Sequence, residues 1–265
     1  MKIAIVGVGN LGSVLAQSLL AHGVSKDDIL LVAKNQSQHH AIHERVGCRP
    51  VHLQQLSDED ILIVAVKPQD VGEVCDSLRS VLSPGTVVLS VMAGVSCGTL
   101  EQRLNHRAIA RAMPNLGARV RESATAFFLP ESLSAAQVAR VEKVIMSCGR
   151  GWRVDREDLI DVATAVAGSG PAYICWLAEQ MEIVARDNGI SPGDAHALVL
   201  QTLKGAVSYL EHDGATFADL RARVTSPNGT TAAALAALEK SCAHTIMRDA
   251  VRAAIQRSIE LGQNS

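Results

Sequence analysis

The stretch IAIVGVGNLG, residues 3–12, decides the fold of the first half of the chain. Four apolar residues predict a buried strand, and the pattern G-x-G-x-x-G follows at the start of a helical period. Gly7 permits a tight turn, Gly9 lets phosphate groups approach the backbone, and Gly12 lets the helix pack closely on the strand. The first amides of the helix then offer an anion site. The segment predicts a dinucleotide-binding turn; a glycine-rich turn without a ligand is the alternative.

Short apolar runs alternate with helical periods through the rest of the first half. Leu11, Leu15 and Leu19 share one helix face, and another helix is expected over residues 134–147. The apolar runs are nearly continuous, which is typical of parallel strands buried on both faces. Strand–helix–strand repetition predicts a parallel sheet with right-handed crossovers. We expect strands at residues 3–6, 29–32, 61–66, 87–89 and 108–111, with a further one at 124–129.

After about Trp152 the pattern is helical throughout. The fold class is therefore an α/β Rossmann-type N-terminal domain, residues 1–152, followed by an all-α C-terminal domain, residues 153–265. Several of its helices are apolar over most of their circumference, and a domain of about 110 residues struggles to cover them. A dimerisation domain is favoured over a tight monomeric bundle. The helices are expected at residues 159–167, 172–188, 192–210, 230–240 and 243–261.

The composition excludes several classes of protein. The 265 residues carry a formal net charge of −2, without the basic stripe of a general nucleic-acid binder or the polybasic patch of a membrane-surface protein. The longest uncharged stretch, residues 162–178, is interrupted by GSGP and is too short for a membrane helix. The first residues lack the long apolar region of a signal peptide. We expect no nucleic-acid partner and no membrane.

Cysteines and histidines bear on location and metals. The six cysteines are scattered and none forms a CxxC pair, which indicates reduced thiols in a cytoplasmic protein. His39, His40 and His43 form a local cluster, but no carboxylate or cysteine completes a ligand set at a recognisable spacing. The cluster is interpreted as a solvated helix face, and no metal site is predicted.

The end of the second strand bears on the choice of nucleotide. A site that prefers NAD usually carries an acidic residue there, which holds the ribose hydroxyls. Asp27 and Asp28 come before the strand, whereas Lys34, Asn35 and Gln36 follow it. A cation and amides suit a 2′-phosphate, so the sequence favours NADP (as NADPH), with NAD possible. In the alternative interpretation, Lys34 is a solvated surface lysine.

Six motifs in order resemble the pyrroline-5-carboxylate reductase family, over essentially the whole chain. The glycine turn is similar to the family's GxGNMG. The later segments are similar to its AVKPQ, a serine-to-AG turn, RxMPN, GSGPAY and VTSPGGTT. Any one motif is modest evidence, whereas all six in matching order and spacing are specific. They lie here at residues 7–12, 65–69, 90–94, 111–115, 168–173 and 224–231.

The resemblance implies a two-domain oxidoreductase of proline biosynthesis. The expected reaction is NADPH-dependent reduction of L-1-pyrroline-5-carboxylate, a cyclic imine carboxylate, to L-proline. The C-terminal helices would interlock in a homodimer or a larger multiple of dimers. One alternative is a reductase of another cyclic imine or of a β-hydroxy acid. Another is a non-catalytic NADP-binding regulator, which would not need to keep the loop of residues 226–231.

By position, the resemblance implies two sites. The substrate would bind on Ser226, Asn228, Gly229, Thr230 and Thr231, with Thr231 as the catalytic residue that donates its hydroxyl to the ring nitrogen. The loop enters a helix, and its amides can hold a carboxylate, although an ordinary capped helix start is the alternative. The cofactor-binding residues, glycine turn included, would be Gly7, Val8, Gly9, Asn10, Leu11, Gly12, Lys34, Asn35, His52, Ala65, Lys67, Pro68, Met92, Ala93 and Gly94.

Three positions depart from the family pattern. Asn228 replaces the first glycine of GGTT; if this position needs a positive φ, asparagine is the next-best residue. His52 stands where relatives often carry asparagine near the adenosine, and Ser123 where they usually carry glycine. None of these removes a group that the reaction requires. Lys67 is interpreted as ordering the AVKP turn and not as a general acid.

Overall fold

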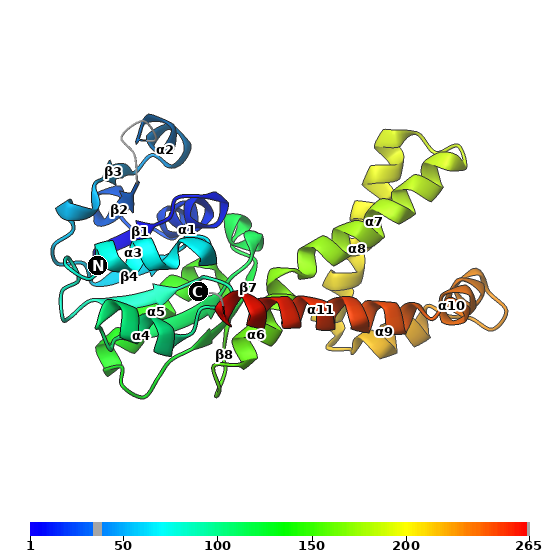
Figure 1. Cartoon of the computed structure of the whole chain (residues 1–265). Coiled ribbons are helices and arrows are strands. Elements are labelled where there is room, and N and C mark those ends of the chain that lie inside the picture. The colour runs from blue at the N-terminus through cyan, green and yellow to red at the C-terminus, as the bar shows by residue number, and fades with distance from the viewer. Residues whose placement is uncertain (34–38, 264–265) are drawn as a thin grey trace. The chain divides into compact units, whose positions relative to one another are not determined.

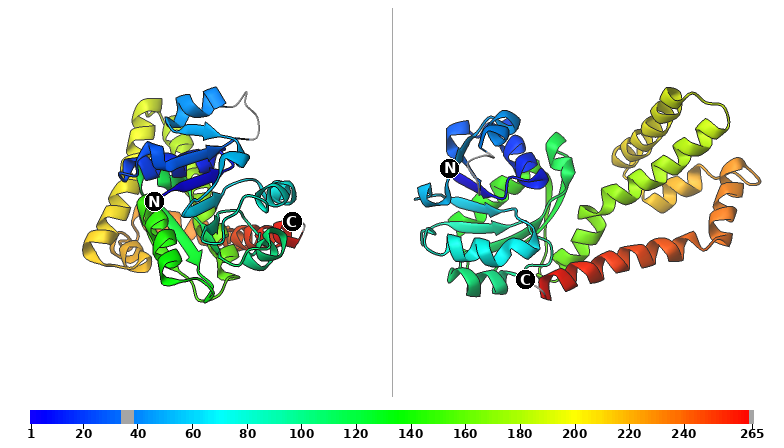
Figure 2. Two further views of the ribbon diagram at one scale, coloured as in Figure 1. Left: turned by 90° about the vertical axis from the view of Figure 1, so that its left-hand side faces the viewer. Right: turned by 45° about the horizontal axis from the view of Figure 1, so that its top comes forward.

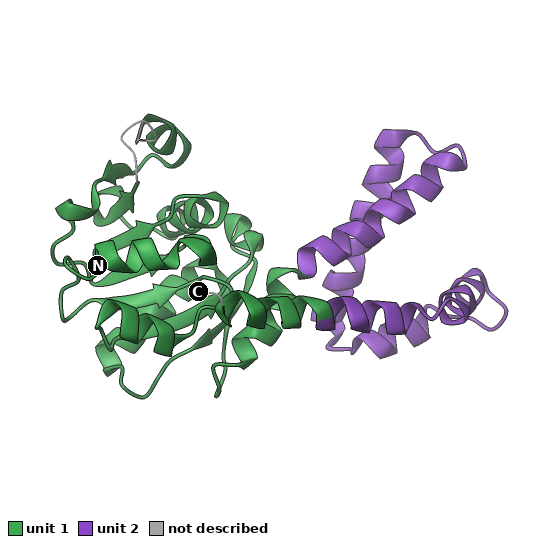
Figure 3. Cartoon of the chain, in the orientation of Figure 1, with its two compact units in different colours: residues 1–169, 253–265 green, residues 170–252 purple. Residues whose placement is uncertain are grey.

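A computed structural model describes residues 1–33 and 39–263 (Figure 1). The chain divides into two compact units (Figure 3). Unit 1 comprises Met1–Ser169 and Ala253–Ser265, and unit 2 comprises Gly170–Arg252. The architecture is the predicted one, a Rossmann-like domain with a parallel sheet followed by helices. The domain boundary at residue 152 stays a prediction.

Unit 1 is built on one eight-stranded sheet of order β3-β2-β1-β4-β5-β6-β7-β8. The first six strands run parallel, in the order of the dinucleotide-binding fold. The prediction of a parallel sheet is right for these strands, whereas β7 pairs antiparallel with β6, and β8 parallel with β7. The strands are β1 (Ile3–Val6), β2 (Ile29–Val32), β3 (Arg49–Val51), β4 (Ile61–Val64), β5 (Val87–Ser90), β6 (Ile109–Met113), β7 (Ser123–Phe128) and β8 (Gly149–Arg153).

Helices cover both faces of this sheet (Figure 2). Alternate residues of a strand point to opposite faces, so Ile3 and Ile5 belong to one buried cluster and Ala4 and Val6 to the other. Both faces therefore need apolar residues, which explains the continuous apolar runs. The first cluster includes residues of α1 (Asn10–Ala21), α2 (His39–Val46) and α5 (Ala135–Cys148), and the second those of α3 (Val71–Leu78) and α4 (Cys97–Leu104).

Helices make up the rest of the chain. α9 was not expected, and the other helices lie where the sequence predicted them. α11 starts in unit 2, and its residues from Ala253 onward belong to unit 1. Within the described residues, none of the helices has the length and apolar character needed to cross a membrane. These helices are α6 (Leu159–Ala163), α7 (Gly170–Asp187), α8 (Pro192–Asp213), α9 (Phe217–Arg223), α10 (Thr230–Lys240) and α11 (Ala243–Gln263).

Unit 2 leaves a row of large apolar side chains exposed along α7. Ile174, Leu177, Met181 and Val184 follow one another at spacings of three and four residues, and each is at least 42% exposed. Residues at this spacing share one face of a helix. A contiguous apolar face of this kind marks a surface that another protein covers. We call these four residues the α7 stripe.

Candidate active site

Three chain segments meet at the carboxyl edge of the parallel strands. Gly7 follows β1, Ala65 follows β4, and Val91 follows β5. The Ala65 N–H donates to the Val6 carbonyl at 2.8 Å, and the Val91 N–H donates to the Val64 carbonyl at 3.0 Å. The strand order reverses between β1 and β4, and an open α/β sheet binds its ligands at such a point.

The glycine turn has the backbone that a dinucleotide needs. Gly7 has a φ of +94°, which an L side chain rarely adopts. A Cβ on Gly9 would meet no described atom within 4 Å, so its backbone borders open space. A Cβ on Gly12 would lie 2.1 Å from the Gly7 carbonyl oxygen, so this glycine allows close packing of helix and turn. Because α1 starts directly after Gly9, its first amides lie beside the open space.

A cavity of about 830 Å³ opens beside this turn. The volume is within the usual range for small-molecule sites, roughly 300–1,000 Å³. Four expected cofactor residues line it: Gly7, Val8, Gly9 and His52. The glycine turn and His52 are thereby brought together from segments about forty residues apart.

Sequence reasoning missed three charged residues of the cavity, Arg45, Asp70 and Glu73. The Arg45 guanidinium donates to the Val8 carbonyl oxygen, and the Arg45 carbonyl accepts from the Gln17 side chain at 2.9 Å. Helix α2 is thus tied to the glycine turn and to α1. In the sequence, the position of the basic Arg45 at the end of the helix that follows β2 could have indicated this contact.

The other expected cofactor residues have different positions. Lys34 and Asn35 lie outside the described residues. Met92 is 1% exposed and belongs to the second apolar cluster, so its backbone and not its side chain is available on the turn after β5. The remaining ones are at the start of α1 and on the turns after β4 and β5, at the carboxyl edge but outside the cavity lining: Asn10, Leu11, Gly12, Ala65, Lys67, Pro68, Ala93 and Gly94.

The expected substrate loop lies in unit 2 and leads into α10. Asn228 has a φ of +58°, so the position does require left-handed backbone, and asparagine stands in for glycine there. The Gly229 N–H donates to the Ser226 carbonyl at 3.0 Å. Gly229 is also the N-cap of α10, and glycine has no side chain with which to cap the helix. The amides of Thr230 and Thr231 therefore start a helix at a point where an anion can bind.

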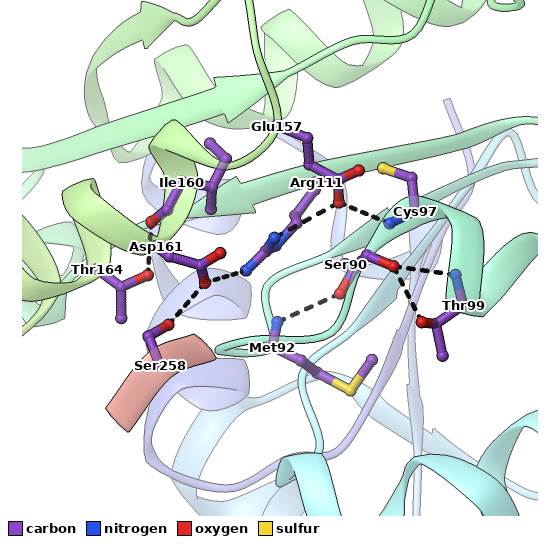
Figure 4. Close-up of polar contacts among 11 residues, drawn as sticks. Ser90, Met92, Cys97, Thr99, Arg111, Glu157, Ile160, Asp161, Thr164 and Ser258 are labelled. Carbon is purple, nitrogen blue, oxygen red and sulfur yellow. Dashed lines mark hydrogen bonds and ion pairs between the residues drawn. The ribbon is translucent and has the colours of Figure 1, made fainter. Parts of the chain in front are cut away.

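A buried ionic network beside β5 was not foreseen. Arg111 pairs in register with Ser90 and is 2% exposed. Its Nη2 donates to Asp161 Oδ1 at 2.7 Å, and its Nη1 donates to Glu157 Oε1 at 3.4 Å (Figure 4). Glu157 Oε1 also accepts from the Cys97 N–H at 2.6 Å. A buried charge must find partners, so an arginine within the apolar run of β6 was the signal.

The electrostatics of the same site exclude Cys97 as a nucleophile. Burial raises the pKa of the Cys97 thiol strongly, and the neighbouring Glu157 carboxylate raises it further. Burial also raises the pKa of Cys48, Cys75 and Cys148. Because the thiolate is the reactive form, these thiols are inert at neutral pH.

Within unit 1, the start of the GSGPAY motif and the residue before it pack on the RxMPN motif. The Asn115 side-chain amide donates to the Ala167 carbonyl at 3.0 Å. A Cβ on Gly168 would approach Met113 Cγ to 3.4 Å. The Ser169 N–H donates to the Thr164 carbonyl at 2.8 Å, which makes this segment a π-helical turn. Gly168 thus lies in a closely packed turn against Met113 at the end of β6.

The fold and the edge site define a class of protein, an oxidoreductase with a dinucleotide-binding domain followed by a helical domain. Two family models match separate parts of the chain. The one described as "NADP oxidoreductase coenzyme F420-dependent" matches residues 2–94. The one described as "Pyrroline-5-carboxylate reductase dimerisation" matches residues 157–261.

Relatives agree along the full length. The chain is 34% identical to the pyrroline-5-carboxylate reductase of Pseudomonas aeruginosa, an alignment that covers 99% of this chain and 97% of the relative. It is 32% identical to pyrroline-5-carboxylate reductase 2 of Bacillus subtilis, over 98% and 95% of the two chains. The chain therefore belongs to the pyrroline-5-carboxylate reductase family, as the six motifs predicted.

Solved structures agree with this assignment. The Plasmodium falciparum pyrroline carboxylate reductase with NADP bound is similar with a TM-score of 0.90 and 27% identity, over 99% of this chain and 98% of that one. The pyrroline-5-carboxylate reductase of Coxiella burnetii has a TM-score of 0.86 and 30% identity, over 98% of each chain.

Proposed function

We propose that the protein catalyses the NADPH-dependent reduction of L-1-pyrroline-5-carboxylate to L-proline, the last step of proline biosynthesis. The observation that carries this function is the coexistence of two features in one chain of the family. One is a glycine turn that borders a cavity of about 830 Å³. The other is a loop that enters α10 through a left-handed Asn228.

The residues at the carboxyl edge fit NADP(H). When bound, the cofactor supplies the hydride. The backbone of Gly7 to Gly9 and the first amides of α1 would hold its pyrophosphate. The turns after β4 and β5 would flank the nicotinamide half, and the NADP bound by the Plasmodium relative supports the choice of nucleotide. Lys34, from its place after β2 in the sequence, would face the 2′-phosphate.

The loop of unit 2 would bind the imine acid. Amides of Gly229, Thr230 and Thr231 would hold the carboxylate at the start of α10. As hydride adds to the imine carbon, the electron pair of the C=N bond moves to the nitrogen. Thr231 Oγ1 would donate a hydrogen bond to the lone pair that forms on that nitrogen. A strong acid is not needed, because a protonated imine is already electrophilic.

The chain carries the dimerisation domain of its family, so a homo-oligomer is the working form. We infer a dimer or a multiple of dimers, which the exposed α7 stripe supports. We also infer a cytoplasmic location. All six cysteines are free, which agrees with a reducing compartment.

The decisive assay follows the loss of NADPH absorbance. L-1-pyrroline-5-carboxylate is compared with piperideine carboxylates and with β-hydroxy acids, the latter followed in the direction of NADP reduction. We expect the highest kcat/KM for pyrroline-5-carboxylate. A higher value for another substrate would assign the chain to the corresponding reductase. Tight NADPH binding without turnover of any substrate would indicate a regulator.

A further inference from the structure

The end of α11 packs on the turn after β5 through two glycines. A Cβ on Gly94 would lie 2.4 Å from the Ser258 carbonyl oxygen and 2.6 Å from the Gly262 nitrogen. A Cβ on Gly262 would lie 2.1 Å from the Gly94 carbonyl oxygen. Real Cβ atoms do not come so close to backbone, so a side chain at either position must separate the helix from the turn. Gly94 has in addition a φ of +78°.

Hydrogen bonds next to this contact join α11 to the buried ionic network (Figure 4). Ser258 Oγ donates to Asp161 Oδ1 at 2.7 Å, the same oxygen that accepts from Arg111 Nη2 at 2.7 Å. Arg111 also donates to Glu157 Oε1, and this oxygen accepts a hydrogen bond from the Cys97 N–H at the start of α4. The turn after β5 thus lies between two elements of one network, α11 and α4.

Most of this network is buried. Arg111 and Ser258 are each 2% exposed, and Asp161 has 13% of its side chain exposed. In such a setting an ion pair that loses a donor leaves a desolvated charge behind, which is costly. The Ser258 hydroxyl is therefore one of the donors that hold Asp161 and, with it, the last turns of α11.

Apart from α11, the turn is held at its two ends, where Val91, Met92 and Val95 are buried in the apolar clusters of the sheet. The Val91 N–H donates to the Val64 carbonyl at 3.0 Å, and the Met92 N–H donates to Ser90 Oγ at 3.3 Å. These bonds fix the beginning of the turn. Gly94, three residues further, is the residue in contact with α11. Ala93 also packs against the cluster of Met113 and Ile160, whereas Gly94 meets α11 directly, so the position of Gly94 depends on where α11 ends.

We propose that the C-terminal part of α11 is a positioning element for the nicotinamide half of the cofactor site, with Gly262 and Ser258 as its positioning residues. The proposal rests on the proposed function, in which the turn after β5 flanks the nicotinamide. Gly262 and Ser258 need not touch cofactor or substrate. They set the depth and orientation of Gly94, and a shift of about 1 Å at such a point is enough to lower a hydride-transfer rate strongly.

The test uses the full-length protein and two ligands, NADPH and 2′,5′-ADP, which resembles the adenosine half and lacks the nicotinamide. Gly262→Ala is expected to weaken NADPH binding about tenfold and to leave 2′,5′-ADP binding within about twofold of wild type. Gly98→Ala is the matched control. It makes the same change in helix α4 of the same unit, where the nearest described atom, Ser96 Oγ, would be 3.9 Å from the new Cβ. The control should change neither affinity.

Ser258→Ala is the second variant, which keeps the test open if Gly262→Ala does not fold. We expect the same split between the two ligands, with a smaller loss of about three- to fivefold for NADPH. Equal losses for both ligands would mean that α11 only stabilises unit 1, and would overturn the proposal. Unchanged NADPH affinity, with or without a lower melting temperature, would overturn it too.

The binding test is separate from the test of function. A wild-type protein that binds both ligands but does not reduce pyrroline-5-carboxylate would refute the proposed substrate, while the ligand split would still decide the role of α11. With an active wild type, a slower single-turnover hydride transfer in Gly262→Ala at saturating NADPH is the expected kinetic counterpart.

Discussion

The two compact units differ in what becomes of their apolar side chains. In unit 1, every residue of β1, β4, β5 and β6 is buried, because helices cover both faces of the sheet. In unit 2, Trp176 is 62% exposed, Val184 61% and Phe217 84%. The sheet of unit 1 therefore buries its apolar strands within one chain. Unit 2 leaves large apolar side chains exposed, as expected of a domain that a second copy covers.

We expect the largest effect on assembly and activity from a substitution in the α7 stripe, the apolar face that unit 2 leaves exposed. Wild-type protein at micromolar concentration should sediment without a stable 28.0 kDa monomer. Met181→Glu places a charge in the middle of the stripe, and burying it against a partner costs several kcal/mol, roughly enough to abolish assembly. We expect dissociated or aggregated protein and a complete loss of reductase activity.

The matched control is Arg186→Glu, which introduces the same side chain on the opposite side of α7. Arg186 is exposed and lies about half a turn away from the stripe. This variant should remain oligomeric and active. A compact, fully active monomer of the wild type, or of Met181→Glu, would refute the view that unit 2 is completed by a second copy.

The second-largest effect is expected on NADPH binding by unit 1, without any change in unit 2. Gly9→Val places a side chain in the open space beside the glycine turn, where the pyrophosphate would lie. Gly9 has a φ of −77°, so valine does not strain the backbone. Loss of two charge-assisted hydrogen bonds, each of about 2 kcal/mol, predicts about a thousandfold weaker NADPH binding. Fluorescence titration measures the affinity, and circular dichroism checks that the melting temperature is unchanged.

Gly12→Val gives the contrasting result three residues later. Its Cβ would lie 2.1 Å from the Gly7 carbonyl oxygen, so this variant should lose stability as well as affinity. If both variants unfold alike, Gly9 is a packing residue and the assignment of the phosphate turn is wrong.

The same contrast explains what could be predicted from the sequence. The sequence predicted β1, β2, β4 and β5, because a strand that is buried on both faces is a continuous apolar run and is easy to recognise. Strand β3, Arg-Pro-Val, and strand β8, Gly-Arg-Gly-Trp-Arg, were missed, because these edge segments are short or polar. Helix α9 is short and charged; its capping box, Thr216 with Asp219, was the signal that remained unused.

Long-range contacts account for what was missed at the site. Arg111 was noticed only as part of a motif, since its partners Glu157 and Asp161 are 46 and 50 residues away. Ser258 bonds to Asp161 across 97 residues. No local sequence pattern indicates contacts between residues so far apart in the chain. In contrast, the left-handed backbone at Asn228 was anticipated because it follows from local sequence, an asparagine in the place of a glycine.

A third prediction separates the tasks of the two units. Thr231→Ala should lower kcat about a hundredfold, because a hydrogen bond that strengthens as the lone pair forms on nitrogen is lost. NADPH affinity should not change, since the glycine turn is in unit 1. Thr231→Ser keeps the hydroxyl and should keep most of the activity. Wild-type turnover in Thr231→Ala would show that solvent protonates the nitrogen and that Thr231 is only a helix-start residue.

The smallest effect concerns the choice between the two nucleotides, which unit 1 should determine alone. Lys34 follows β2 and Lys26 precedes it, so the same strand carries one lysine at its carboxyl end and one at its amino end. Only the carboxyl end borders the ligand edge of an open α/β sheet.

Lys34→Ala should lower the NADPH-to-NADH ratio of kcat/KM about tenfold, the value of one exposed charge-assisted contact to a 2′-phosphate. Lys26→Ala removes the same charge from the protein as a whole and should leave the ratio unchanged, which separates a local contact from a general electrostatic effect. The KM for the imine should be equal in both variants, since the substrate loop is in unit 2. A wild-type preference for NADH, or an equal ratio in the two variants, would mean that Lys34 is a solvated lysine and that other residues of the cavity select the nucleotide.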